Sequence, residues 1–356
     1  MKFAGRRIIS KISISILAAA TLVGCGTKSE DRFSKVAIPA ENRVDVEFRR
    51  LDKELTGMNY AQSASEFAKL KEAYAAHDTT DQNFLDIYTE AVLNIGDVEQ
   101  METRNVLQKF ATGKPYCEFF QDADSVFPDV AKEKHELDNA FSILKTHLPE
   151  MNVPQQYVGF ISGFYSNVLC TKTRLGFSLE YYLGAQYPNY KYVDGLYDYM
   201  VCNYRREKLV SDGVFCWLTT EYEFKEPAPT LLQKIVYLGK LVYLTSVALP
   251  EQDMHTILGY TKDQYEWCCQ NEAQMWHYMA EYKHLFSTDR LTVGKYCDPA
   301  PSTAFFPQDS PGRSGLFVGY KIVESYLEAN KEITLQQLMQ INDASEILEM
   351  SGYNPK

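Results

Sequence analysis

The chain has 356 residues, 45% of them apolar and 13% aromatic, and its 36 basic and 47 acidic side chains give a net charge of −11. This apolar content suffices for one large core or two ordinary ones and argues against disorder beyond the N-terminus. The acidic balance argues against nucleic acid as a partner and against charge-driven binding to anionic lipid.

The first 25 residues are organised like a bacterial secretory signal. Four basic residues precede an apolar stretch at 12–22, and Leu-Val-Gly-Cys at 22–25 matches a lipobox. The apolar stretch is shorter than the roughly 20 residues of a spanning helix, so we expect a cleaved signal peptide at 1–24 and not a retained anchor. Palmitate-type acyl chains on Cys25 would then hold the protein on a membrane. Gly26 follows Cys25 in place of the aspartate that often marks inner-membrane retention, which favours the outer membrane.

Residues 25–42 are predicted to form a lipidated polar tether, and 43–356 a single domain, because we find no repeat or linker. Alternating apolar and polar residues at 44–52 predict a strand. Helices are predicted at 60–77, 81–94, 98–110 and 129–147, and an aromatic loop at 119–128.

Three runs of β-branched and aromatic residues, separated by turn residues, predict a small antiparallel sheet. They lie at 157–162, 167–173 and 175–183, and helices are predicted after them at 194–210 and 213–222. The predicted fold class is therefore mainly α with a small antiparallel β-sheet, α+β.

Eight tyrosines lie between positions 181 and 204. A tyrosine-lined groove could bind a peptide or a glycan, because each ring has an apolar face and a polar tip. The alternative, which we favour, is aromatic packing of a loop under the helices. The candidate partner or groove residues of this region are Glu180, Tyr181, Tyr182, Tyr187 and Tyr190.

Residues 228–286 form the block around which the chain is predicted to pack. Thr230 is a suitable N-cap for a helix at 231–249 that is apolar almost all round. Lys234 and Lys240 favour a core helix over a membrane span, since each lysine near mid-bilayer costs roughly 2.5 to 3.5 kcal/mol. An amphipathic helix at 265–286 follows, opened by a capping box of Thr261 and Gln264.

The last predicted helices begin at Ser310-Pro311 and at Thr334, which has Gln337 three residues later. The loop at 310–315 could also receive an anion, with free amides and Arg313 converging on it. Gly315 and Gly319, one turn apart, are predicted to let another helix approach closely.

No His-Glu-x-x-His pattern for catalytic zinc occurs in the chain, and no metal or cofactor is predicted. His277, Glu281 and His284 are weak metal-ligand candidates, because a helix would place them on one face. Glu272 lies among apolar positions near Trp276, so we expect a buried carboxylate in an ion pair with Arg313 or Lys240, and the alternative is a functional carboxylate. Glu272, Trp276 and Arg313 are further candidate partner or groove residues.

Several short motifs in order resemble the gliding-motility lipoprotein GldB family. They lie at 48–55, Leu-Glu-Tyr-Tyr-Leu-Gly 179–184, 187–190, 239–243, Gly-Tyr-Thr-Lys-Asp-Gln 259–264, 267–276, Pro-Ala-Pro 299–301, Ser-Pro-Gly-Arg-Ser-Gly 310–315 and 351–356. The last segment departs from the family, with Gly352 and Asn354 where lysines are usual.

The resemblance implies a membrane-anchored envelope protein associated with gliding motility and, by extension, with the secretion machinery linked to it. Because the chain lacks His-Glu-x-x-His, we expect a non-catalytic component or accessory of this machinery. The family is also distantly similar to predicted zinc peptidases, but the helix expected to carry the motif reads Asn-Tyr-Arg-Arg-Glu at 203–207. We therefore expect a degenerate zinc-peptidase-like scaffold without hydrolysis. The alternatives are a metallopeptidase-like hydrolase with scattered ligands and a peptide- or glycan-binding module.

Overall fold

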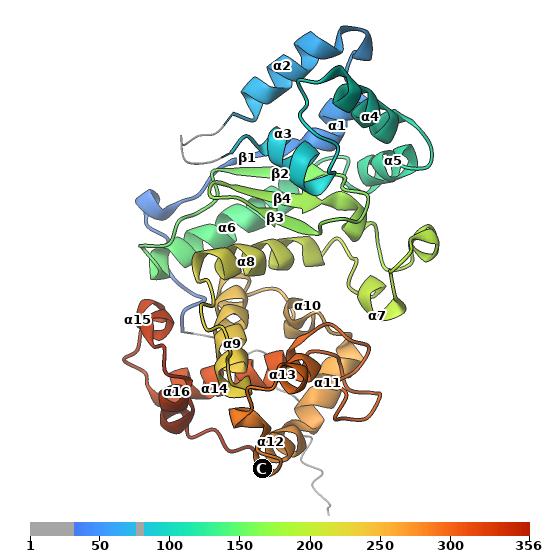
Figure 1. The fold of residues 1–356 in the computed structure, drawn as a ribbon. Helices are drawn as coiled ribbons and strands as arrows, with labels where there is room; N and C mark the ends of the chain where they lie inside the picture. Colours follow the sequence, from blue (N-terminus) through green and yellow to red (C-terminus); the bar gives the residue numbers. More distant parts are fainter. Residues whose placement is uncertain (1–31, 76–81) are drawn as a thin grey trace, which may run out of the picture.

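A computed structural model describes residues 32–75 and 82–356. A four-stranded sheet with its helices forms one half, and the helices from α9 onward form the other (Figure 1). The predicted α+β class is confirmed. The predicted signal peptide and Cys25 lie outside the described residues.

The sheet is mixed, in the spatial order β1 (Glu47–Arg50), β2 (Gln156–Phe160), β4 (Arg174–Ser178) and β3 (Val168–Cys170). The four predicted strands are confirmed, but β2 pairs in parallel with both β1 and β4. Of the three strand pairs in this sheet, β3 with β4 is the one that has the predicted antiparallel pairing. Every residue of β2 and β4 is buried, as is usual for parallel strands covered on both faces.

The helices between β1 and β2 form the crossover that parallel pairing requires. Phe84 and Tyr88 from this crossover pack edge-on against Phe160 on one face of the sheet, and α6 and α8 cover the other face (Figure 1). The elements are α1 (Leu51–Thr56), α2 (Ser63–Ala73), α3 (Phe84–Asp86), a π-helix (Ile87–Val92), α4 (Met101–Thr112), α5 (Cys117–Val126) and α6 (Ala131–His147).

Three predictions for the first half were wrong in detail. The aromatic segment at 119–128 is mostly helix α5, because Phe119, Phe120 and Ala123 bury one side of it. Residues 179–182 form a 3-10 helix and do not extend β4. The predicted helix at 194–210 is reduced to the four-residue α7 (Asp198–Val201), and α8 (Lys208–Glu221) follows.

Helix α9 (Leu231–Ala248) is the centre of the second half. Thr230 caps it in a capping box with Gln233. The helix is long and apolar enough to cross a membrane, but 83% of it is buried inside the protein. The prediction of a core helix is confirmed, since α14 (Ser314–Ala329), α16 (Ala344–Ser351), α6 and α8 all pack on it.

The other helices of this half are α10 (Met254–Leu258), α11 (Lys262–Gln270), α12 (Glu272–Glu281), α13 (Arg290–Cys297) and α15 (Leu335–Gln340). The capping boxes at Thr261 and Thr334 are confirmed. The single helix predicted at 265–286 is wrong, because Asn271 leaves helical geometry and separates α11 from α12.

The N-terminal segment contacts the domain from its first described residue. Arg32 Nη2 donates to the carbonyl oxygen of Ile333 at 2.8 Å, and Phe33 packs edge-on against His147. The segment at 32–42 therefore contacts the domain at Arg32 and Phe33, and the lipidated polar tether at 25–42 stays a prediction.

Candidate functional site: a cavity between the two halves

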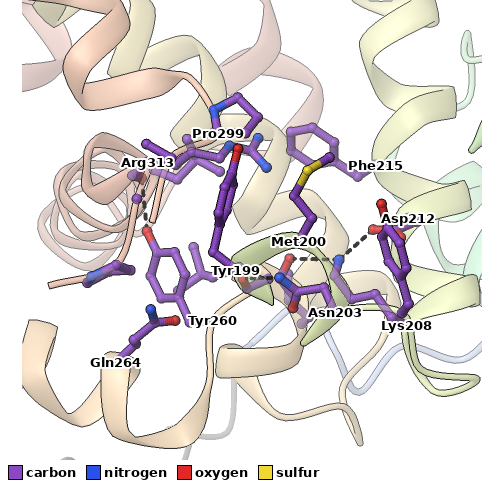
Figure 2. Close-up of a pocket in the computed structure, with 18 of the residues that line it drawn as sticks. Tyr199, Met200, Asn203, Lys208, Asp212, Phe215, Tyr260, Gln264, Pro299 and Arg313 are labelled. Atoms are coloured by element: carbon purple, nitrogen blue, oxygen red, sulfur yellow. Dashed lines mark hydrogen bonds and ion pairs between the residues drawn. The ribbon is translucent and has the colours of Figure 1, made fainter. Parts of the chain in front are cut away.

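The candidate site is a cavity of about 390 Å³ where the sheet half meets the helical half (Figure 2). Its walls come from α7, from α8, from the segment around Gly259 and from the loop before α14. The residues that carry its chemistry are Asn167, Tyr181, Tyr199, Asn203, Lys208, Asp212, Phe215, Tyr260 and Arg313.

Two backbone features shape the wall contributed by the helical half. Gly259 ends α10 in the left-handed conformation at φ +73°, which turns the chain toward α11. Gly312 lies so close to the Ala300 carbonyl that a Cβ would come within 2.0 Å of the oxygen. This contact holds the two loops together and leaves Arg313, at φ 61°, as the N-cap residue of α14.

The predicted start of α14 at Ser310 is therefore wrong. Ser310 is fully buried, and its hydroxyl accepts a hydrogen bond from the backbone N–H of Thr303 at 3.3 Å. The Tyr260 hydroxyl donates to the Arg313 carbonyl at 2.9 Å, so one aromatic wall of the cavity is tied to the N-terminus of α14 (Figure 2).

An ion pair between a buried lysine and a partly exposed aspartate forms the floor on the α8 side. Lys208 Nζ lies 2.5 Å from Asp212 Oδ1, with side-chain exposures of 8% and 23%. Lys208 also donates to the Ile257 carbonyl at 3.5 Å, and the Tyr182 hydroxyl donates to Asp212 Oδ2 at 3.2 Å. The pair is stabilised by hydrogen bonds from both halves, as a buried pair must be.

Three polar atoms of the lining are buried and have no hydrogen-bond partner among the described residues. They are Asn167 Oδ1, Asn203 Oδ1 and Arg313 Nε. Asn203 Nδ2 already donates to the Gly259 carbonyl at 2.8 Å, which fixes the amide and leaves its oxygen toward the cavity. Buried polar atoms without partners are uncommon, so these three atoms are the candidates for contacts with a bound molecule. The site can offer two acceptors and one cationic donor.

The structure brings two of the sequence candidates together here, because Tyr181 and Arg313 both line the cavity. The other candidate tyrosines, Tyr182, Tyr187 and Tyr190, do not line the cavity. Tyr182 is buried, Tyr187 donates to Asp122 Oδ2 at 2.5 Å, and Tyr190 donates to the Glu180 carbonyl at 2.7 Å.

Glu180 is fully buried and does not line the cavity. Its Oε1 accepts from the Ser162 and Phe164 backbone N–H groups at 2.8 and 3.1 Å, and its Oε2 accepts from the Ser178 hydroxyl at 2.8 Å. Burial raises the pKa of this carboxyl, although these donors oppose the shift. Glu180 holds the loop after β2, where Phe164 has φ +70°.

Glu272 and Trp276 lie away from the cavity, at Tyr353 near the C-terminus. The Tyr353 hydroxyl donates to Glu272 Oε1 at 2.9 Å, and its ring packs edge-on against Trp276. Burial raises the pKa of Glu272, which the nearby Lys321 opposes. The expected partners were wrong, since Arg313 lines the cavity and Lys240 donates to the Ile341 carbonyl.

The weak metal candidates are not held on one helix. His277 and Glu281 are exposed on α12, which ends at Glu281, and Lys283 turns the chain at φ 58°. His284 then accepts or donates at the Tyr296 hydroxyl, 2.9 Å away, inside an aromatic cluster. In residues 32–75 and 82–356, no group of three or more His, Cys, Asp or Glu side chains could hold a metal ion.

Sequence reasoning missed Lys208, Asp212 and Asn203. The sequence did contain a signal for Lys208 and Asp212. They lie at i and i+4 in a helix with many apolar residues, and such a pair on a buried face needs internal partners. Asn203 gave no such signal, since its role depends on the contact with Gly259 from the other half.

The comparisons with known proteins give one match. Neither curated proteins nor solved structures match the chain significantly. A family model described as "Gliding motility protein GldB" matches residues 33–355, which is nearly the whole chain and includes every residue of the cavity. This protein therefore belongs to the GldB family of gliding motility proteins.

Proposed function

We propose that the protein is an envelope lipoprotein, anchored in the outer membrane through acylated Cys25, that serves as a non-catalytic component of the gliding-motility machinery and its associated secretion apparatus. The family match over 33–355, directly behind a lipobox, is the observation that carries this proposal.

The polar pair of the cavity is not a pair of metal ligands. The polar pair at i and i+4 on α8 is Lys208 and Asp212, and the ammonium group has no lone pair with which to ligate a metal. The two groups already neutralise each other at 2.5 Å.

Metabolic labelling with an alkyne analogue of palmitate tests the anchor. The wild-type protein should be labelled and recovered with outer membranes, whereas the Cys25→Ala variant should carry no label. Cys117→Ala is the matched control and should be labelled like the wild type. Unlabelled wild-type protein in the cytosol would refute the proposal. Crosslinking of the tethered protein in envelopes should then capture motility or secretion components.

A second function, peptide binding, is favoured by the three unpartnered polar atoms of the cavity. Asn167 Oδ1 and Asn203 Oδ1 can accept from peptide N–H groups, and the Arg313 guanidinium can receive a carboxylate. Tyr199 and Phe215 supply aromatic faces beside them (Figure 2). The cavity thus matches an extended peptide segment that ends in a free carboxylate.

We test this binding by measuring how much of two random hexapeptide libraries the full-length lipoprotein retains. One library has free C-termini, and the other has the same sequences with amidated C-termini. The free-acid library should be retained and the amidated one should not. Arg313→Gln should abolish the difference. Arg205→Gln is the control, because Arg205 also has a buried Nε without a partner among the described residues but does not line the cavity. Equal retention of both libraries would exclude carboxylate recognition.

A further inference from the structure

Two cysteines face each other where the edge of the sheet meets α8. Cys170 is the last residue of the edge strand β3, and Cys216 lies in the middle of α8. Their Sγ atoms are 3.1 Å apart, although 46 residues separate them in sequence. β3 and α8 pack directly on each other, so this approach belongs to the core architecture of the sheet half.

The two thiols differ in acidity. The Cys170 thiol donates its hydrogen bond to Cys216, which lowers the pKa of Cys216 and, together with burial, raises the pKa of Cys170. Cys216 is therefore the more nucleophilic partner at neutral pH, since the thiolate is the attacking species. A disulfide needs an Sγ–Sγ distance of about 2.0 Å, so closure requires a movement of about 1 Å.

We propose that Cys170 and Cys216 form a disulfide in the mature protein through exchange with a disulfide oxidant of the envelope. This inference rests on the proposed export, because such bonds persist in oxidising compartments. The Cys216 thiolate attacks the oxidant, forms a mixed disulfide and releases one thiolate. Cys170, as its thiolate, then attacks Cys216 Sγ and releases the second. The protein loses two protons and two electrons, and the oxidant is reduced to two thiols.

The bond would fasten the helix that carries the floor of the cavity. Lys208, Asp212 and Phe215 all lie on α8, and Phe215 is adjacent to Cys216. Oxidation joins this helix covalently to β3, which is held to the rest of the sheet through β4. The cavity wall on α8 is then held in position by a covalent bond as well as by noncovalent packing.

Alkylation of envelopes under acid quench, followed by non-reducing peptide mass spectrometry of the full-length protein, tests the bond. We expect a peptide pair linked through Cys170 and Cys216 and lighter by two hydrogen atoms than the two thiol peptides together. Reduction should lower the melting temperature by about 5 °C. Finding both cysteines alkylated in membrane-bound, lipid-labelled protein would overturn the inference and leave the proposed function standing.

Single substitutions provide the matched controls. Cys170→Ser should leave Cys216 free to alkylate, and Cys216→Ser should do the same for Cys170. Each single variant should show no change in melting temperature on reduction. The melting temperature of the double variant should be no lower than that of either single variant. Cys117→Ser should retain the link and the shift. A linked peptide that survives in Cys170→Ser would assign Cys216 to another partner and refute the pairing.

Discussion

Gly239 on α9 and Gly319 on α14 mark the point where the two central helices touch. A Cβ on Gly239 would lie 2.2 Å from the Gly319 carbonyl oxygen, and one on Gly319 would lie 1.9 Å from the Ile235 carbonyl oxygen. No side chain fits there, so the two backbones are in direct contact. The prediction that Gly315 and Gly319 allow a close helix approach is confirmed, with Gly315 against the Ile235 side chain.

Gly319→Ala should therefore destabilise the protein, although alanine has the higher helix propensity. The propensity gain is about 1 kcal/mol, and we expect overpacking against Ile235 to outweigh it and leave a net loss of about 2 kcal/mol. Urea unfolding followed by circular dichroism measures the change. Glu328→Ala on the exposed side of α14 is the control and should change stability little. A stabilised Gly319→Ala variant would show that the helices lie further apart.

Local signals made much of the second half predictable. The Thr-x-x-Gln capping boxes at Thr230, Thr261 and Thr334 fix helix starts through bonds within four residues, and a sequence contains that information directly. The same reasoning failed at Ser310, because its hydroxyl accepts a bond from the Thr303 loop in place of an N-cap bond. That contact depends on the fold of another segment.

The pairing of the strands and the assembly of the cavity could not be predicted from local sequence signals. The turn residues between the three runs led us to predict antiparallel pairing, but β4 lies between β2 and β3 and pairs with β2 in parallel. Parallel pairing is decided by helices covering both faces, which is a long-range property. Tyr181 and Arg313 were each noted from sequence, yet their common cavity exists because α8 and the loop before α14 meet across the two halves.

Glu180→Ala should cost about 3 kcal/mol, because it removes the acceptor of the Phe164 N–H and leaves the Ser162 N–H with the Ser178 hydroxyl, 3.1 Å away, in place of a carboxylate. Glu180→Gln keeps one oxygen and should cost less. Guanidinium denaturation measures both, with exposed Glu251→Ala as the control. Equal losses for the alanine and glutamine variants would show that the hydrogen bonds to the oxygen contribute little.

The Lys208–Asp212 pair should show strong coupling. Asp212→Ala strands a buried ammonium and should cost about 3 kcal/mol, and Lys208→Met should cost a similar amount because it leaves the carboxylate without its cation. The double variant Lys208→Met/Asp212→Leu should lose less than the sum of the two, since neither charge remains. A thermodynamic cycle from urea unfolding measures the coupling, and additive losses would contradict it.

Lys240 should make stability rise with pH between about 8 and 10. Burial lowers its pKa from 10.5 to about 8, so in this window the unfolded chain binds a proton that the folded protein has released. The unfolding free energy then increases by up to about 1 kcal/mol per pH unit. Urea unfolding of the wild type and of Lys240→Met at pH 7.5 and 9.5 measures this contribution as the difference between their two slopes. Buried thiols such as Cys268 and Cys297, and the buried tyrosines, act with the opposite sign in both proteins and cancel in that difference. Lys240→Met should lower the slope by up to about 1 kcal/mol per pH unit and raise stability at neutral pH, while exposed Lys262→Met should preserve the wild-type slope. Identical slopes for Lys240→Met and the wild type would place the ammonium group in water.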